Sequence, residues 1–316
     1  MHTHSPGARR SALRDLPTLA LIVVFGGVWA AALALPGDLG WLAVVLLIPA
    51  LTLHSSLTHE ILHGHPFGHA GAETVLGLWQ PGLAIPYLRF KRLHLAHHRD
   101  AALTDPYDDP ESAYLDPGVW ARLPRVVRGI LRINNTLAGR ILLGPAIGTY
   151  LFWRDDLRAI RAGAPHVLRD WLAHLPGVAL TLVLVALSAL PLWAYLLACY
   201  GALSVLKIRT FLEHQAHLRV SGRTVIIEDR GPLAFLFLNN NLHLVHHMHP
   251  AVPWYRLPAL YAARREAYVA RNHGYVYRSY AQVFARYLWR AKEPVAHPHW
   301  REAPICAIKG HDTASS

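Results

Sequence analysis

The chain has 316 residues, of which 53% are hydrophobic, and its formal net charge is +11. A mean hydropathy of +0.21 is too high for an ordinary soluble domain, and the chain is too short for several large domains. No nucleic-acid motif or basic repeat accompanies the positive charge, so no nucleic-acid partner is predicted.

Two long apolar windows follow a basic start at residues 1–15, which we expect to be disordered. The first window runs from Leu16 to Thr58 without Lys, Arg or Glu, and the second runs from Leu175 to Leu206 without any charged residue. A membrane-spanning helix needs about 20 mostly apolar residues, so each window can hold two short spans.

Proline and glycine divide each window into a predicted hairpin. The sequence PGD at 36–38 breaks the first window, and Pro191 breaks the second. One long kinked helix in each window is the alternative. The four predicted spans are 17–35, 40–58, 176–190 and 192–207.

The segments outside the windows have other patterns. Residues 66–93 contain GLWQPGLAIPYLRFKR, whose prolines predict an interfacial or re-entrant piece instead of a span. Residues 119–165 are predicted to form amphipathic helices at the membrane surface, because Arg140 interrupts their apolar run. VIIE at 225–228 is strand-like, and residues 254–293 carry Arg, Tyr and Leu at the spacing of surface helices.

Lysine and arginine lie before, between and after the windows, but in neither predicted turn. Cytoplasmic segments are enriched in these residues, so we expect both termini to be cytoplasmic and both hairpins to point outward. The predicted fold is an all-α integral membrane protein with about four transmembrane helices in two hairpins and a cytoplasmic helical cap. Residues 16–293 form its one domain, and a polar tail follows at 294–316.

Three histidine boxes lie near the ends of apolar segments. In HEILH, two histidines four residues apart share a helix face, so both imidazoles can reach one metal. In HLAHH and HLVHH, we expect the first and fourth residues to share a face, with the fifth beside them. Imidazole suits iron, zinc, copper and nickel, and the boxes together predict a shared metal centre. The boxes contain His59 and His63, then His94, His97 and His98, then His243, His246 and His247.

Polar residues outside the boxes leave two interpretations open. The acidic residues after the second box either orient its histidines or pair with Arg99, or they form a solvated turn. They are Asp105, Asp108, Asp109 and Glu111. The histidines near the chain ends are predicted to be solvated, and they are His2, His4, His297, His299 and His311.

HEILH also matches the HExxH signature of zinc peptidases. A catalytic zinc needs three protein ligands and an open position, whereas the boxes offer too many histidines for one zinc. No Asp-Gly pair supplies the acidic third ligand of an intramembrane peptidase, so we expect Glu60 to orient a ligand imidazole instead. A histidine-rich metal transporter is another alternative, but it would place its ligands within the spans.

HEILH, HLAHH and HLVHH, in this order, resemble the membrane fatty acid desaturase and hydroxylase superfamily, whose pattern is HxxxH, HxxHH, HxxHH. HEILHGHP and NNNLHLVHH are similar to a bacterial subgroup of desaturase-like oxygenases. The resemblance covers the chain from about Leu16 to Trp289. It implies a non-haem di-iron centre of two Fe ions, held almost entirely by histidine, that uses O₂ as a co-substrate to attack an unactivated C–H bond.

The resemblance also implies ligands outside the three boxes. Family members add a histidine before the third box, often as Glu-His, and this matches Glu213-His214. His217 is the competing choice. Some members use a nearby asparagine through a water, and the candidates are Asn239, Asn240 and Asn241.

The activity implied by the resemblance is an O₂-dependent desaturase or hydroxylase reaction, most often on a fatty acyl or other lipid substrate. The family also contains carotenoid ketolases, and the bacterial subgroup acts on small non-lipid metabolites. Because the sequence shows no fused cytochrome b5, ferredoxin or flavin motif, we expect an external ferredoxin- or rubredoxin-like electron donor with its reductase. The expected location is the inner membrane of a bacterium, among membrane lipids.

Overall fold

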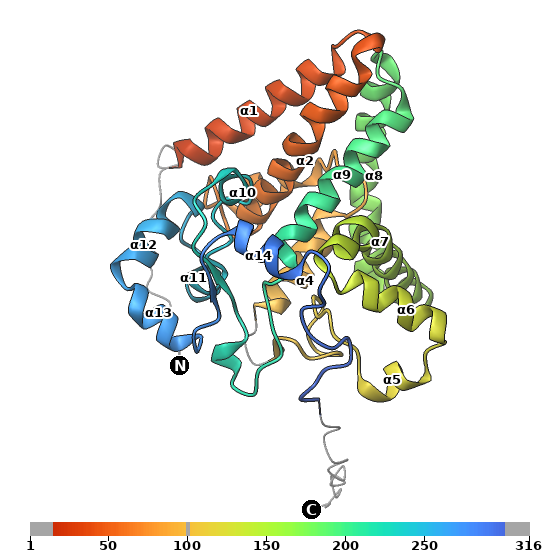
Figure 1. The fold of residues 1–316 in the computed structure, drawn as a ribbon. Helices are drawn as coiled ribbons and strands as arrows, with labels where there is room; N and C mark the ends of the chain where they lie inside the picture. Colours follow the sequence, from red (N-terminus) through yellow and green to blue (C-terminus); the bar gives the residue numbers. More distant parts are fainter. Residues whose placement is uncertain (1–14, 99–101, 301–316) are drawn as a thin grey trace, which may run out of the picture.

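The computed structural model describes residues 15–98 and 102–300 (Figure 1). Three expectations lie outside these residues: the character of residues 1–14, the pairing of Arg99, and the tail beyond residue 300. His2, His4 and His311 belong to the same undescribed segments.

Two helical hairpins form the apolar part of the molecule. Helices α1 (Leu16–Leu33) and α2 (Gly40–Leu62) are joined through η2 (Gly37–Leu39), and α8 (Pro165–Leu187) is joined to α9 (Leu192–Thr210). Within the described part of the chain, these are the four helices that are long and apolar enough to cross a membrane. The all-α, four-span prediction is therefore confirmed, and the single kinked helix is wrong for both windows.

The second, third and fourth spans are longer than predicted, whereas the first, Leu16–Leu33, is close to the predicted 17–35. The third begins at Pro165 instead of 176, so its first turns include the charged Asp170. This carboxylate is buried and accepts hydrogen bonds from the Arg92 guanidinium at 3.0–3.3 Å. The charge of Asp170 is tolerated inside α8 because it is paired with Arg92. The prediction placed the start of this span too late because it required a window without charged residues.

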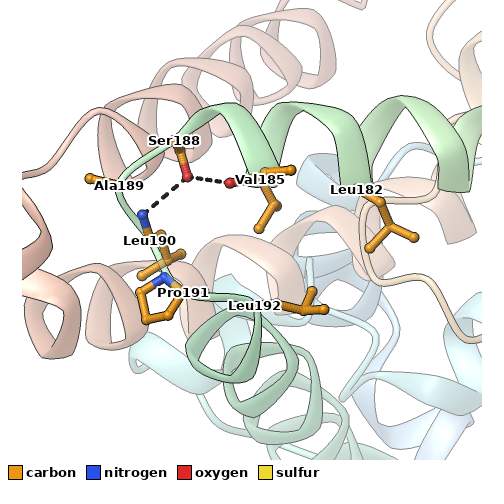
Figure 2. Close-up of a pocket in the computed structure, with 8 residues that line it drawn as sticks. Leu182, Val185, Ser188, Ala189, Leu190, Pro191 and Leu192 are labelled. Carbon is orange, nitrogen blue, oxygen red and sulfur yellow. Dashed lines mark hydrogen bonds between the residues drawn. The ribbon is translucent and has the colours of Figure 1, made fainter.

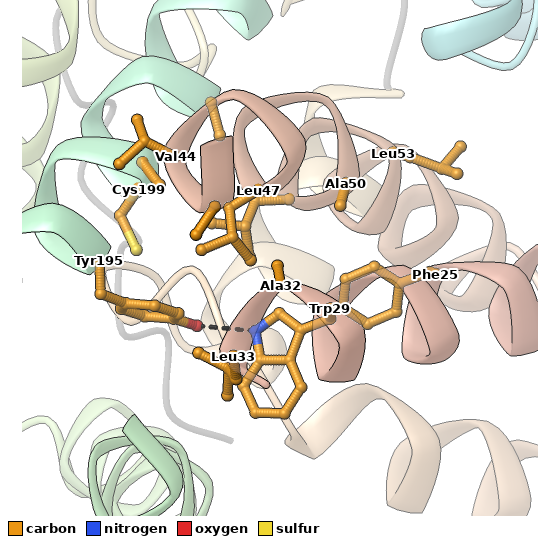
Figure 3. Packing of buried hydrophobic residues seen from close by; sticks show 14 of the residues in the cluster. Phe25, Trp29, Ala32, Leu33, Val44, Leu47, Ala50, Leu53, Tyr195 and Cys199 are labelled. Atoms are coloured by element: carbon orange, nitrogen blue, oxygen red, sulfur yellow. Dashed lines mark hydrogen bonds between the residues drawn. The ribbon is translucent and has the colours of Figure 1, made fainter. Parts of the chain in front are cut away.

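The two hairpins pack through a shared apolar interior (Figure 3). Leu47 on α2 is fully buried, and the Trp29 indole on α1 donates a hydrogen bond of 3.0 Å to the Tyr195 hydroxyl on α9. Ala194 and Ala198 are also fully buried, and such small residues let helix backbones approach closely in a membrane.

The turn between α8 and α9 lies at the end of the second hairpin opposite Pro165 and Thr210. Ser188 closes it by donating to the Val185 carbonyl at 2.8 Å and accepting from the Leu190 amide at 3.2 Å (Figure 2). A mostly apolar hollow of about 510 Å³ adjoins this turn. It contains no histidine and takes no part in the candidate site.

The proline-broken segment after the first hairpin, residues 66–93, packs against the spanning helices α8 and α9. Helix α3 (Ala70–Leu78) and helix α4 (Tyr87–His97) flank an irregular segment. The Pro81 carbonyl accepts from the Tyr195 hydroxyl at 2.8 Å, and the Trp79 indole donates to Thr181 at 3.0 Å. The prediction of a broken piece that does not span is confirmed, and its polar backbone is satisfied by side chains of the spanning helices.

Three amphipathic helices follow, namely α5 (Pro117–Arg122), α6 (Arg125–Asn134) and α7 (Leu137–Arg161). Helix α7 is not one of the four spans, as predicted from Arg140, whose guanidinium donates to the Asn134 carbonyl at 2.9 Å. A buried Arg89–Asp156 pair, with contacts of 2.6–3.1 Å, joins α4 to α7.

The cap is built from short elements after α9. Strand β1 (Ile226–Ile227) pairs in parallel with β2 (Val276–Tyr277), so the strand-like VIIE is confirmed, but β2 interrupts the predicted helical region 254–293. The helical elements of the cap are η4 (Val220–Gly222), α10 (Pro232–Leu236), α11 (His243–Met248), η5 (Trp254–Arg256), α12 (Leu257–Ala263), α13 (Arg265–Arg271) and α14 (Tyr280–Tyr287).

Residues 291–300 run back across the cap as a strap. The Leu115 amide donates to the Val295 carbonyl at 2.9 Å, and the His297 amide donates to the Leu115 carbonyl at 2.8 Å. The prediction that His297 is solvated is wrong: it is 6% exposed and its imidazole lies 3.2 Å from the Thr104 hydroxyl. The polar composition of the strap does not predict this packing, because backbone and side-chain hydrogen bonds hold the strap in place instead of apolar contacts.

Candidate metal centre

All nine histidines predicted as ligands converge near the carboxyl ends of α2 and α9. Helix α2 brings the first box, α4 brings the second, and α11 brings the third. His214 arrives from the segment after α9 and joins them. The first cluster contains His59, His63, His94, His98 and His246, and the second contains His97, His214, His243 and His247.

The boxes divide between the clusters differently from the sequence expectation. In each HxxHH box the first and fifth histidines share a cluster, and the fourth crosses to the other cluster. Residues i and i+4 lie about 40° apart around a helix, whereas i+3 lies on the other side of residue i. Each HxxHH box therefore contributes to both clusters: its first and fifth residues enter one cluster, and its fourth residue enters the other.

The spacing within each cluster fits a metal ion. The candidate ligand atoms of a cluster all lie within 4.8 Å of one another. The Nε2 atoms of His94 and His98 are 2.9 Å apart, and those of His214 and His243 are 3.2 Å apart. A metal–imidazole bond is about 2.0–2.1 Å long, so two ligands at right angles around a metal lie about 3 Å apart.

Two further atoms support this fit. The Nε2 atoms of His59 and His63 are buried, and neither has a hydrogen-bond partner among residues 15–98 and 102–300. A buried polar nitrogen without a partner is costly, and a coordinated metal would satisfy it. The stacked rings of His98 and His247, with centroids 4.3 Å apart, join the two clusters directly.

Most of these imidazoles are held neutral. Burial, with repulsion from His94 and His247, lowers the pKa of His63 to about 2. Burial and neighbouring histidines also lower the pKa values of His98, His214, His243 and His246. A neutral imidazole offers a nitrogen lone pair, which metal coordination requires.

His97 differs because carboxylates face it. Burial acts to lower the pKa of this imidazole, but Glu111 and Asp109 outweigh burial and raise it to about 9. Its Nδ1 lies 2.7 Å from Asp109 Oδ1. The carboxylate therefore holds a proton on Nδ1 and leaves Nε2 facing the second cluster.

Other outer nitrogens have partners of the same kind. His94 Nδ1 lies 3.0 Å from Glu111 Oε1, and His243 Nδ1 lies 3.0 Å from Asn240 Oδ1. The acidic turn after the second box thus orients histidines, whereas Asp105 caps the turn itself by accepting from the Tyr107 and Asp108 amides. Of the three candidate asparagines, Asn240 alone has a hydrogen bond to a cluster histidine among the described residues.

The competing histidine lies elsewhere. His217 Nδ1 contacts the Arg219 carbonyl at 2.9 Å, and its ring stacks on His273 at 5.1 Å. His217 belongs to neither cluster.

Glu60 does not have its expected partner. Its Oε2 accepts a hydrogen bond of 3.0 Å from the Trp254 backbone amide, whereas its Oε1 stays 3.8 Å from His59 Nδ1. The carboxylate therefore anchors the start of η5 to the end of α2. The expectation that Glu60 orients a ligand imidazole is wrong, because that nitrogen is beyond hydrogen-bond distance.

No sequence pattern predicted the residues that hold His214. The Lys292 ammonium donates to the His214 backbone carbonyl, and the Tyr114 hydroxyl donates to the Glu293 carboxylate. The Ala216 amide donates to that hydroxyl at 2.8 Å. These residues belong to segments far apart in the chain, and the strap brings them together.

Four helices of spanning length and apolarity, with two histidine clusters beside the end of α2, are the features of a membrane metalloprotein. Residues 39–281 match the family described as fatty acid desaturase, and the chain belongs to this family. It is 28% identical over 239 residues to a beta-carotene ketolase from Paracoccus sp. (strain PC1), covering 72% of this chain and 78% of the relative. A beta-carotene ketolase from Paracoccus sp. (strain N81106 / MBIC 01143) is 28% identical over 244 residues, with the same coverage.

Proposed function

We infer that this protein is a membrane di-iron oxygenase that uses O₂ and external electrons to oxidise a C–H bond of a lipid-soluble substrate. The observation that carries the proposal is the division of nine histidines into adjacent clusters of five and four. Two clusters favour two metal ions. Each cluster would supply four or five imidazole nitrogens to hold one ion.

Iron, when bound, supplies the reduction of O₂ and the oxidation of the C–H bond. The chain's own residues hold the ligands in place. Asp109, Glu111 and Asn240 fix the outer nitrogens of His97, His94 and His243, respectively, so that each Nε2 faces its cluster. Burial favours the neutral form of His98, His214, His243 and His246 by lowering their pKa values, and it keeps bulk water away from the clusters.

A lipid-soluble substrate is favoured by the position of the clusters. They lie at the ends of helices with membrane-spanning character, where a molecule dissolved in the bilayer can arrive. Both relatives are named beta-carotene ketolases, so a methylene of a carotenoid ring is one candidate. A fatty acyl chain is the other, and it is favoured by the name of the family.

Electrons for the reaction come from a separate donor protein on the cytoplasmic side. The lysine and arginine distribution supports a cytoplasmic cap in a bacterial inner membrane, with the hairpin turns outward. The cap and the clusters then face the compartment that contains soluble ferredoxin-like proteins.

The test is substrate conversion in membranes from cells that make the full chain. Membranes receive beta-carotene or a fatty acid, a ferredoxin with its reductase, and isotopically labelled O₂. Mass spectrometry then detects labelled ketone or hydroxyl product, or an unlabelled alkene. His246→Ala should insert into the membrane but give no product. Equal conversion by this variant, or proteolysis without O₂ consumption, would overturn the proposal.

A further inference from the structure

A basic hollow of about 630 Å³ lies on the cap beside the third histidine box. Met248 and His249 form part of its wall, and they directly follow His246 and His247 in the chain. The opposite wall comes from α13 and from the segment around η4. Met248 in its wall is thus one residue along the chain from His247 of the second cluster and two residues from His246 of the first.

Three arginines around this hollow carry uncompensated charge. Arg219, Arg264 and Arg271 are exposed, and none of them forms an ion pair within residues 15–98 and 102–300. Their neighbour Arg265 differs, because it contacts Glu228 at 2.6 Å. One exposed carboxylate, Glu266, lies on α13. The balance is strongly positive, which favours an acidic partner.

Apolar side chains stand among these charges. Met248 is 37% exposed, and Leu218, next to Arg219, is 77% exposed. A small apolar patch with charges around it suits a weak, fast contact between redox proteins, in which charge guides the encounter.

The hollow has a short connection to both clusters. The His249 amide donates to the His246 carbonyl at 3.0 Å, and the His249 imidazole lies 3.0 Å from the Tyr268 hydroxyl in the wall of the hollow. His246 belongs to the first cluster and His247 to the second. A reductant bound here would therefore be close to both candidate metal positions.

The location favours a soluble partner over the bilayer. Figure 1 shows α12 and α13 at the end of the molecule opposite the turn between α1 and α2. Helix α13, which supplies part of the wall of the hollow, is thus distant from the turn of the first hairpin.

We propose that the arginine-lined hollow is the docking site of an acidic one-electron donor protein. The proposal rests on the function inferred above. Hydroxylation consumes the substrate R–H, O₂, two electrons and two protons, and it yields R–OH and water. The donor therefore docks twice per turnover and is oxidised by one electron each time.

The test uses the iron-loaded full chain in detergent and a purified acidic [2Fe–2S] ferredoxin as the probe. The variant carries Arg219→Glu, Arg264→Glu and Arg271→Glu. The control carries Arg230→Glu, Arg278→Glu and Arg290→Glu, which change the same charge at exposed cap positions outside the hollow. Binding is measured at low ionic strength, and iron reduction is followed with ferredoxin or with a small viologen reductant.

We expect the hollow variant to bind ferredoxin about tenfold or more weakly, while the control stays near wild type. Viologen should reduce all three proteins equally. Equal ferredoxin binding by the hollow variant, or no binding by wild type, would overturn the docking site. If wild type is a dimer and the hollow variant is a monomer, the face would be assigned to a second copy of the chain instead. If the hollow variant is retained more weakly in anionic than in neutral nanodiscs, the face would be assigned to lipid instead. Failure of viologen to reduce any protein while ferredoxin still binds would count against the di-iron function and leave the docking site supported.

Discussion

Lys292 donates a hydrogen bond from its ammonium group to the backbone carbonyl of His214, although 77 residues separate them in the chain. His214 has its Nε2 only 2.9 Å from that of His97 in the second cluster. The strap that follows the last helix therefore sets the position of a candidate ligand near the centre of the molecule.

Replacing this lysine should weaken one metal position selectively. Lys292→Met removes the contact to the His214 carbonyl, and we expect the four-histidine cluster to lose metal affinity about tenfold or more. The five-histidine cluster should keep its metal. Iron content after dialysis measures this, with Lys91→Met as the control, because Lys91 lies over the Tyr87 ring and outside both clusters. Equal loss from both positions would show that the strap stabilises the whole fold instead.

Asp109 and Asp108 provide a matched pair of neighbours. Asp109 is buried against His97, whereas Asp108 is exposed in the same turn. Asp109→Asn removes the charge that holds the Nδ1 proton of His97, and we expect metal affinity to fall about 10–100-fold. Asp108→Asn should leave it unchanged. Competition with a metal chelator gives both affinities, and equal values for the two variants would refute an orienting role.

Variants of His214 and His217 test which of these two histidines is the additional metal ligand before the third box. His214→Ala should lower the iron content, because the variant removes one of four candidate ligands in its cluster. His217→Ala should retain iron, because this imidazole contacts the Arg219 carbonyl and His273 instead. Elemental analysis of the two purified variants decides the point. A reversed result would place His217 in the metal centre.

Glu60 distinguishes this site from a zinc peptidase. Glu60→Gln keeps an oxygen that can accept from the Trp254 amide, so we expect iron content and turnover within a few-fold of wild type. Glu60→Leu leaves that buried amide unsatisfied and should cost about 1–3 kcal/mol of stability. Thermal unfolding and iron analysis test both variants. A Glu60→Gln protein that folds and binds iron but has no turnover would make Glu60 a catalytic residue.

Much of the architecture could be predicted because it depends on local patterns. Apolar runs broken by Pro191 and by the glycine and proline before Asp38 predict two hairpins, and the i, i+4 spacing of His59 and His63 predicts their common cluster. These features need only helix geometry and transfer of apolar residues into lipid.

The rest depends on contacts between distant segments. Which boxes supply histidines to the same cluster follows from how α2, α4 and α11 meet, and spacing within one box does not contain that information. The partner of Glu60 is a backbone amide, which has no sequence signature. His297 lies in the predicted polar tail and Lys292 at the end of the predicted helical region 254–293, and neither pattern reveals the long-range hydrogen bonds of these residues.

The most direct test of a di-iron centre is the metal content of the full chain, purified in mild detergent from iron-fed cells. Two clusters of histidines predict about two irons per chain. Full occupancy by about one zinc per chain, without iron, would contradict this account and favour a peptidase or a metal transporter.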